Sequence, residues 1–164
     1  MAPRILIADD QEMILKALRT LLERNSRFEV CGTAENGSEA VVKVQEVHPD
    51  LVILDLAMPI MDGLEAALEI SKIQPDTPIL LYTMTDDPQV RMEAAKAGMR
   101  EVIGKSAAPQ LLLAAIERAL KKETPAAVPT ASESELPLAV TAAETGTNTP
   151  AEHPDFLSNP PRAS

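Results

Sequence analysis

Short apolar runs alternate with longer amphipathic segments along the first 122 residues. The runs cover about residues 4–8, 28–32, 51–54, 79–82 and 101–103, and each has the length and composition of a strand. The segments between and after them cover about 14–22, 40–47, 64–73, 88–97 and 109–122, and their apolar residues recur every three or four positions, as in half-buried helices. Strand and helix therefore alternate five times, which predicts an α/β fold with a parallel sheet covered on both faces.

Several residues are predicted to mark where these elements end. Gly32 is expected to close the second strand, and Ser38 is expected to cap the second helix after the turn Asn36-Gly37. Gly98 is expected to stop the fourth helix. The buried stripe of the last helix is predicted to comprise Leu111, Leu112, Ala115, Ile116, Ala119 and Leu120.

Polar residues stand at the carboxyl ends of four of the five predicted strands. They are Asp9 and Asp10 after the first, Asp55 after the third, Thr83 after the fourth and Lys105 after the fifth. The carboxyl ends of parallel strands meet at one edge of a sheet, where open α/β folds bind ligands. We therefore expect three carboxylates, a hydroxyl and an ammonium group to lie together.

This set of side chains is typical of phosphoryl transfer. Three carboxylates repel one another unless a cation lies among them, and ligands that are all oxygen suit Mg²⁺. A metal ion, a lysine and a hydroxyl group neutralise and position a phosphoryl group, and a carboxylate can accept it covalently. Asp55 is the candidate acceptor because it stands alone on a central strand, whereas Asp9 and Asp10 form a pair suited to holding metal. The alternative interpretation is a purely structural ion-pair cluster.

These positions resemble the receiver domain of two-component response regulators. The motifs that carry the resemblance are Asp9-Asp10, Leu-Asp55-Leu-Ala-Met-Pro59-Ile-Met-Asp-Gly63, Thr83 and Gly-Lys105-Ser. The resemblance covers about residues 4–122 and implies a flavodoxin-like sheet in the order 2-1-3-4-5. We therefore expect a receiver domain over 1–122.

The resemblance also implies a role for each site residue. Asp55 would take a phosphoryl group from the phosphohistidine of a histidine kinase or phosphotransfer protein. Asp10, Asp55 and the backbone carbonyl of Ala57 would bind Mg²⁺, and Asp9 would assist through water. Thr83 would move onto a phosphoryl oxygen, and Lys105 would pair with it. Phosphorylation would then change the surface formed by the fourth helix, fifth strand and fifth helix, without making the protein an enzyme toward other substrates.

Two residues depart from the family pattern. Val102 occupies a position where receivers often carry Tyr or Phe, which predicts weaker or different coupling between the site and the surface. Met84 follows Thr83, where the family usually has a small residue, and its side chain is expected to restrict access to the site.

The last 42 residues differ in composition from the rest. Residues 123–164 are rich in Pro, Ala, Thr and Ser, and carry six acidic residues against Arg162 alone. Such a segment cannot bury enough apolar surface to fold, so we predict a disordered acidic tail. It stands where related regulators carry a DNA-binding helix-turn-helix domain. The His153–Leu157 segment is either a short partner-binding motif or part of a passive tail.

The net charge and the composition limit the classes of binding partner and the cellular compartment that we expect. The net charge of −10 argues against direct binding to DNA or to an anionic membrane. The chain has no apolar stretch long enough to span a bilayer and a single cysteine, Cys31, which together favour the cytoplasm. The expected partners are a kinase or phosphotransfer protein and an unknown output protein, with a phosphorylation-dependent second copy as a further candidate.

Two other functions compete with phosphorylation-dependent signalling. A receiver-like module that docks without being phosphorylated needs none of the five site residues, yet all five are present. A phosphatase of the haloacid-dehalogenase type needs a second Asp two residues after its nucleophile, and that position is Ala57. Nucleotide binding is disfavoured because the chain has neither of the glycine-rich phosphate loops.

Overall fold

The computed structural model describes residues 1–24 and 26–122. Five strands alternate with five helices along this part of the chain, as predicted. The strands are β1 (Arg4–Ala8), β2 (Glu29–Ala34), β3 (Leu51–Leu54), β4 (Ile79–Thr83) and β5 (Glu101–Gly104). The helices are α1 (Glu12–Arg24), α2 (Gly37–Val47), α3 (Gly63–Ile73), α4 (Pro88–Lys96) and α5 (Pro109–Leu120).

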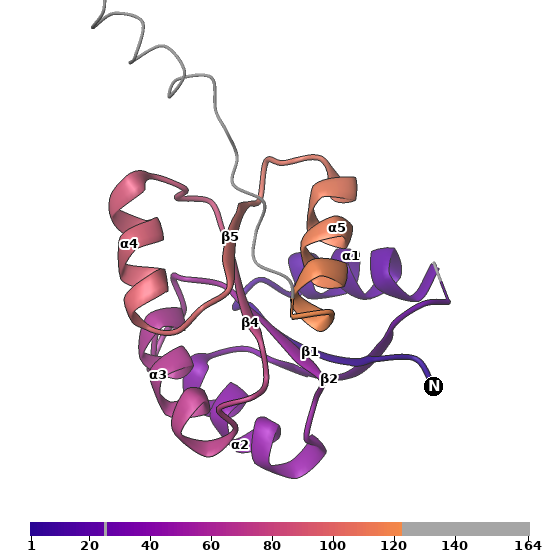
Figure 1. Cartoon of the computed structure of the whole chain (residues 1–164), viewed down its shortest axis with the longest axis horizontal. Helices are drawn as coiled ribbons and strands as arrows, with labels where there is room; N and C mark the ends of the chain where they lie inside the picture. Colours follow the sequence, from indigo (N-terminus) through magenta and orange to yellow (C-terminus); the bar gives the residue numbers. More distant parts are fainter. Residues whose placement is uncertain (25, 123–164) are drawn as a thin grey trace, which may run out of the picture. The chain divides into compact units, whose positions relative to one another are not determined.

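The strands form one parallel sheet in the order β2-β1-β3-β4-β5, which confirms the predicted flavodoxin-like topology. Helices α1 and α5 cover one face of the sheet, and α2, α3 and α4 cover the other (Figure 1). The chain reverses its direction of winding between β1 and β3, so a crevice opens beyond the carboxyl ends of these two strands. The residues that follow β1 and β3 are therefore placed at the binding edge.

Two aliphatic cores hold this arrangement, one on each face of the sheet. In β3 every residue is buried: Val52 and Leu54 pack toward α2, α3 and α4, while Leu51 and Ile53 pack toward α1 and α5. A central strand covered on both faces explains the uninterrupted apolar run in the sequence. The end of that run fixes the point where the chain leaves the core, at Asp55.

The prediction that Gly32 closes the second strand is wrong. Strand β2 continues through Gly32 to Ala34. Its register against β1 shifts by one residue at Cys31, which leaves this residue as a β-bulge. A glycine inside a strand often accompanies a bulge, so Gly32 marks an irregularity in the pairing and not the end of the strand.

Two helix assignments also differ from the prediction. The cap of α2 is Asn36, whose side-chain oxygen accepts a hydrogen bond from the Glu39 N–H at 2.8 Å, so Ser38 lies inside the helix. Both residue types cap helices well, and the Asn-Gly pair that suggested a turn is itself the helix start. In α5, Leu111 is 57% exposed, whereas the other predicted stripe residues are buried or partly buried.

The predicted acidic tail, residues 123–164, lies outside the described residues, and so does its His153–Leu157 segment. Within the described ranges, no helix has both the length and the apolar character needed to cross a membrane. Cys31 is partly buried against the core, and burial raises the pKa of its thiol, which fits a packing role and not a reactive one.

Candidate functional site

Asp55 lies directly after β3, at the carboxyl edge of the sheet. Its backbone N–H donates to the Ala8 carbonyl at 2.9 Å, which extends the β1–β3 pairing by one residue. Its side chain is almost completely buried, and Oδ1 accepts a hydrogen bond from the Leu56 N–H at 2.9 Å. The carboxylate is therefore held in a fixed position at the carboxyl edge of the sheet.

Asp9 and Asp10 follow β1 and lie beside Asp55. One carboxylate oxygen from each of the three residues lies within 4.8 Å of the others. Asp9 is 1% exposed and Oδ1 accepts a hydrogen bond from the Gln11 N–H at 2.9 Å, while Asp10 is exposed. The predicted cluster of three carboxylates is thus present, with two buried members and one that faces solvent.

Lys105 and Thr83 complete the set at the same edge. Lys105 Nζ lies 2.6 Å from Asp9 Oδ2 and 3.2 Å from Asp55 Oδ1, and its side chain is 5% exposed. The short contact to Asp9 is an ion pair by distance, without a directed hydrogen bond to Oδ2 from the described residues. Thr83 is buried, and its hydroxyl oxygen accepts the Thr85 N–H at 3.2 Å.

The electrostatics of the site favour an additional cation. Burial, followed by the negative charge of Asp9, raises the pKa of Asp55, and Lys105 only partly opposes this. Burial lowers the pKa of Lys105, but its close interactions with the Asp9 and Asp55 carboxylates outweigh burial, so its pKa is raised. The two shifts are consistent, because one ammonium group lies beside two buried carboxylates. The two negative charges favour the charged form of Lys105, whereas the single positive charge does not fully offset the burial of Asp55 and its repulsion by Asp9.

The donor set fits Mg²⁺. All the converging ligand atoms are carboxylate oxygens, which are the ligands this hard cation prefers, and one exposed member leaves room for water in the shell. The backbone carbonyl of Ala57 stays a prediction as a ligand, and Ala57 itself is exposed at the start of the loop that follows Asp55. When bound, the ion would neutralise the charge of a phosphoryl group beside Asp55.

The chain matches the response regulator receiver domain family over residues 5–117. It is 36% identical over 121 residues to the chemotaxis protein CheY of Thermotoga maritima, covering 74% of this chain and all of that protein. The chain belongs to the receiver domain family.

Solved structures agree with this assignment. A LuxR-family two-component response regulator from Aurantimonas has a TM-score of 0.73 and 28% identity, with 88% of this chain and 100% of that chain covered. The CheX–CheY–BeF3–Mg²⁺ complex of Borrelia burgdorferi has a TM-score of 0.65 and 25% identity, with 69% and 85% covered. Receiver domains are signalling modules that accept phosphoryl groups and bind Mg²⁺ at an acidic pocket, which confirms the predicted family and its general chemistry.

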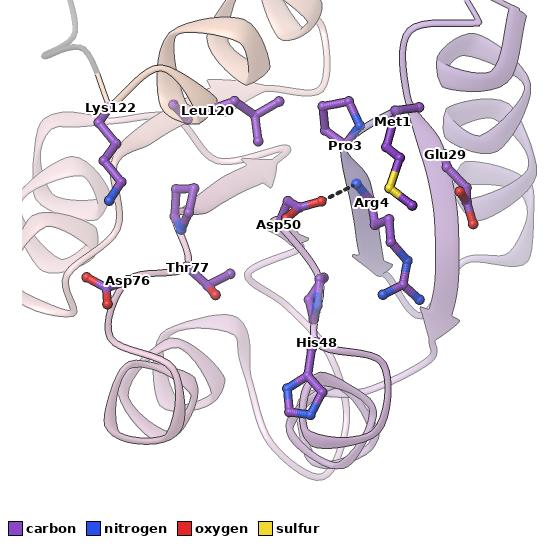
Figure 2. Close-up of a pocket in the computed structure, with 14 residues that line it drawn as sticks. Met1, Pro3, Arg4, Glu29, His48, Asp50, Asp76, Thr77, Leu120 and Lys122 are labelled. Carbon is purple, nitrogen blue, oxygen red and sulfur yellow. Dashed lines mark hydrogen bonds between the residues drawn. The ribbon is translucent and has the colours of Figure 1, made fainter.

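A pocket at the opposite edge of the sheet lies away from this site. It has a volume of about 810 Å³ and lies at the amino ends of the strands, where Arg4, Asp50 and Thr77 are among its lining residues. Figure 2 shows that its charged groups come from the starts of strands and from separate turns. The backbone N–H of Arg4 donates to Asp50 Oδ2 at 2.7 Å. These groups lie mostly at the surface, whereas the three acids at the opposite edge converge and two of them are buried. We therefore assign function to the Asp55 edge.

The sequence reasoning did not identify how the loop after Asp55 is held. Gly63 begins α3 so close to β3 that a Cβ atom there would lie 2.1 Å from the Asp55 carbonyl oxygen. Gly37, at the start of α2, makes a similarly close approach to the Met61 carbonyl oxygen. The Asn-Gly and Asp-Gly pairs at these positions signal a turn or a helix start, but neither pair reveals which distant backbone the glycine touches.

Proposed function

We propose that this receiver domain accepts a phosphoryl group on Asp55 from a histidine kinase or phosphotransfer protein and signals through phosphorylation-dependent protein contacts. The observation that carries the proposal is the burial of Asp55 beside Lys105 and two further carboxylates. Kinases and phosphotransfer proteins are the donors of receiver domains generally. We place this reaction in the cytoplasm.

Each residue of the site would have its own role in phosphoryl transfer. An Asp55 carboxylate oxygen forms the new bond to phosphorus as the bond from phosphorus to the donor's histidine nitrogen breaks. Asp10, Asp55 and the Ala57 carbonyl would hold Mg²⁺, with Asp9 assisting. Lys105 is already within ion-pair distance of Asp55 and would stabilise the transferred phosphoryl oxygens. The chemistry is confined to the transfer and hydrolysis of this domain's own aspartyl phosphate.

The signal would leave the site through Thr83. Its hydroxyl would give up its contact with the Thr85 N–H and move onto a phosphoryl oxygen, which shifts the surface of α4, β5 and α5. Val102, where related domains often have an aromatic residue, is buried in the core shared with α4 and has no ring to swing outward. An output protein or a second copy of the domain would bind the shifted surface, and the net charge of −10 disfavours DNA as the direct partner.

The proposal is tested by incubating the full chain with Mg²⁺ and a small phosphodonor and measuring the intact mass. We expect a mass increase of one phosphoryl group that is lost over time and is absent when EDTA replaces Mg²⁺. If no donor gives an adduct in Mg²⁺, the phosphoacceptor role is wrong and the receiver-like docking module becomes the better explanation.

Met84 allows a second test of the site. It follows Thr83 and its side chain is 74% exposed, so removing it should not disturb the core. If it restricts access, Met84→Ala should speed both phosphorylation by the small donor and hydrolysis of the adduct by about threefold, or ~0.6 kcal/mol in activation free energy. Both rates follow from the same mass measurement over time, and rates equal to those of the parent would exclude the gating role.

A further inference from the structure

The loop between Asp55 and α3 contains a strained backbone turn. The Met61 N–H donates to the Pro59 carbonyl at 2.7 Å, and Ile60 between them has φ of +71°. A bond across three residues with a positive central φ defines the rarer and more strained form of γ-turn. Isoleucine is branched at Cβ and rarely adopts this left-handed conformation, so the turn must be held by its surroundings.

The Ile60 side chain does not hold the turn, because it is 83% exposed. The backbone that follows it is held instead by helix α2. The N–H of Gly37, the first residue of α2, donates to the Met61 carbonyl at 3.0 Å. At the base of the loop the Gly63 N–H donates to the Leu56 carbonyl at 2.9 Å, so the loop is anchored on both sides of the strained turn.

The contact with α2 requires glycine. A Cβ atom at position 37 would lie 2.5 Å from the Met61 carbonyl oxygen, 2.9 Å from Met61 Cγ and 3.0 Å from the Asp62 carbonyl oxygen. Two of these three atoms are backbone, which cannot move aside without moving the loop. Gly37 is also buried, so a side chain there could not turn outward to solvent.

We propose that Gly37 is a positioning residue for the Mg²⁺ site. Its N–H donates a hydrogen bond to the Met61 carbonyl and so holds the strained turn in place. This contact also fixes the loop that begins at Asp55 and contains the Ala57 carbonyl. Without this contact the loop relaxes at Ile60 and the carbonyl moves away from the carboxylates. The inference rests on the function proposed above, and it adds that a residue on α2, outside the acidic cluster, sets the affinity for the metal.

The test is Gly37→Ala in the full chain, with Mg²⁺ affinity measured by NMR titration. Outer residues that orient metal ligands typically change affinity by 10- to 100-fold, and we expect at least tenfold weaker binding here. Gly32→Ala is the matched control, because its Cβ would meet no backbone atom and only two side-chain atoms, Leu6 Cδ1 at 3.1 Å and Lys43 Cδ at 4.0 Å. Binding by Gly37→Ala equal to the parent's would overturn the inference, whereas a parent that binds no Mg²⁺ would overturn the proposed function itself.

A double-variant cycle separates positioning from general damage. Glycine adopts a positive φ without strain, so Ile60→Gly should recover part of the lost Mg²⁺ affinity in the Gly37→Ala background and have little effect in the parent. An equal effect of Ile60→Gly in both backgrounds would contradict the inference.

The parent chain gives a measurement that does not depend on any variant folding. If the Gly37 contact and Mg²⁺ binding are coupled, saturation with Mg²⁺ must slow hydrogen exchange at the Gly37 amide, because coupling is reciprocal. An unchanged exchange rate at this amide, with Mg²⁺ bound, would also overturn the inference.

Discussion

Asp55→Asn should abolish the phosphoryl adduct and, at the same time, make the metal-free protein more stable. Asparagine has nearly the same shape but its amide is not a nucleophile, so no adduct should form with any donor. The carboxylate it replaces is buried against Asp9 and is only partly compensated by Lys105. Removing one of two neighbouring buried negative charges relieves repulsion, while Lys105 keeps its 2.6 Å contact with Asp9.

The stabilisation should depend on pH in a defined direction. The pKa of Asp55 is raised by burial and by Asp9, so the folded state binds this proton more tightly than the unfolded state does. At pH values below the unfolded pKa the carboxyl group is protonated in both states, and the parent and variant should be equally stable. The parent then loses stability relative to the variant as the pH rises through the folded pKa, so the difference should be larger at pH 7 than at low pH.

The measurement is thermal unfolding of both proteins in EDTA at pH 7 and near pH 4. We expect Asp55→Asn to melt a few degrees higher at pH 7, the shift produced by ~1 kcal/mol in a domain of this size, and the gap to close toward pH 4. Adding Mg²⁺ should favour the parent, because a ligand stabilises the form that binds it better. A variant that melts lower than the parent at pH 7 in EDTA would show that the charged Asp55 is favourable and would contradict this electrostatic account.

The fold followed from the sequence because its signals are local and repeated. The run Leu51–Leu54 is apolar throughout because β3 is covered on both faces, and its end places Asp55 at the sheet edge without any tertiary information. The same logic placed Asp9 and Lys105 at that edge, and their contact at 2.6 Å is the outcome of parallel pairing. Errors arose where two local signals were equally good, as between Asn36 and Ser38 for the cap of α2.

The parts of the site that could not be predicted depend on close approaches between distant backbones. Nothing around Gly37 in the sequence indicates that its amide binds the Met61 carbonyl, because that contact exists only once α2 has packed beside the loop. The positive φ of Ile60 runs against local preference, since isoleucine rarely adopts it. Sequence patterns report average preferences, and strained loops held by tertiary contacts are where those preferences are overruled.

Gly63→Ala should be the most destabilising single-methyl change in this domain. A Cβ atom at position 63 would lie 2.1 Å from the Asp55 carbonyl oxygen, 3.0 Å from its carbon and 3.1 Å from Leu56 Cα. All three are backbone atoms. The Asp55 N–H donates a hydrogen bond to the Ala8 carbonyl, so the end of β3 cannot shift without breaking its pairing with β1. Added volume in a packed interior typically costs 1–3 kcal/mol, and an overlap this severe should cost about 3 kcal/mol or more.

Two other glycines provide graded controls for Gly63→Ala in urea unfolding. Gly98 has φ of +84° with its nearest neighbour at 3.4 Å, so Gly98→Ala should lose about 1–2 kcal/mol through backbone strain alone. At Gly104 the nearest atoms lie at 3.6 Å, an ordinary contact, so Gly104→Ala should be neutral or stabilise by up to ~1 kcal/mol through the unfolded state. A Gly63→Ala protein as stable as Gly104→Ala would mean that α3 can withdraw from β3, and that the close approach does not fix the backbone of Asp55.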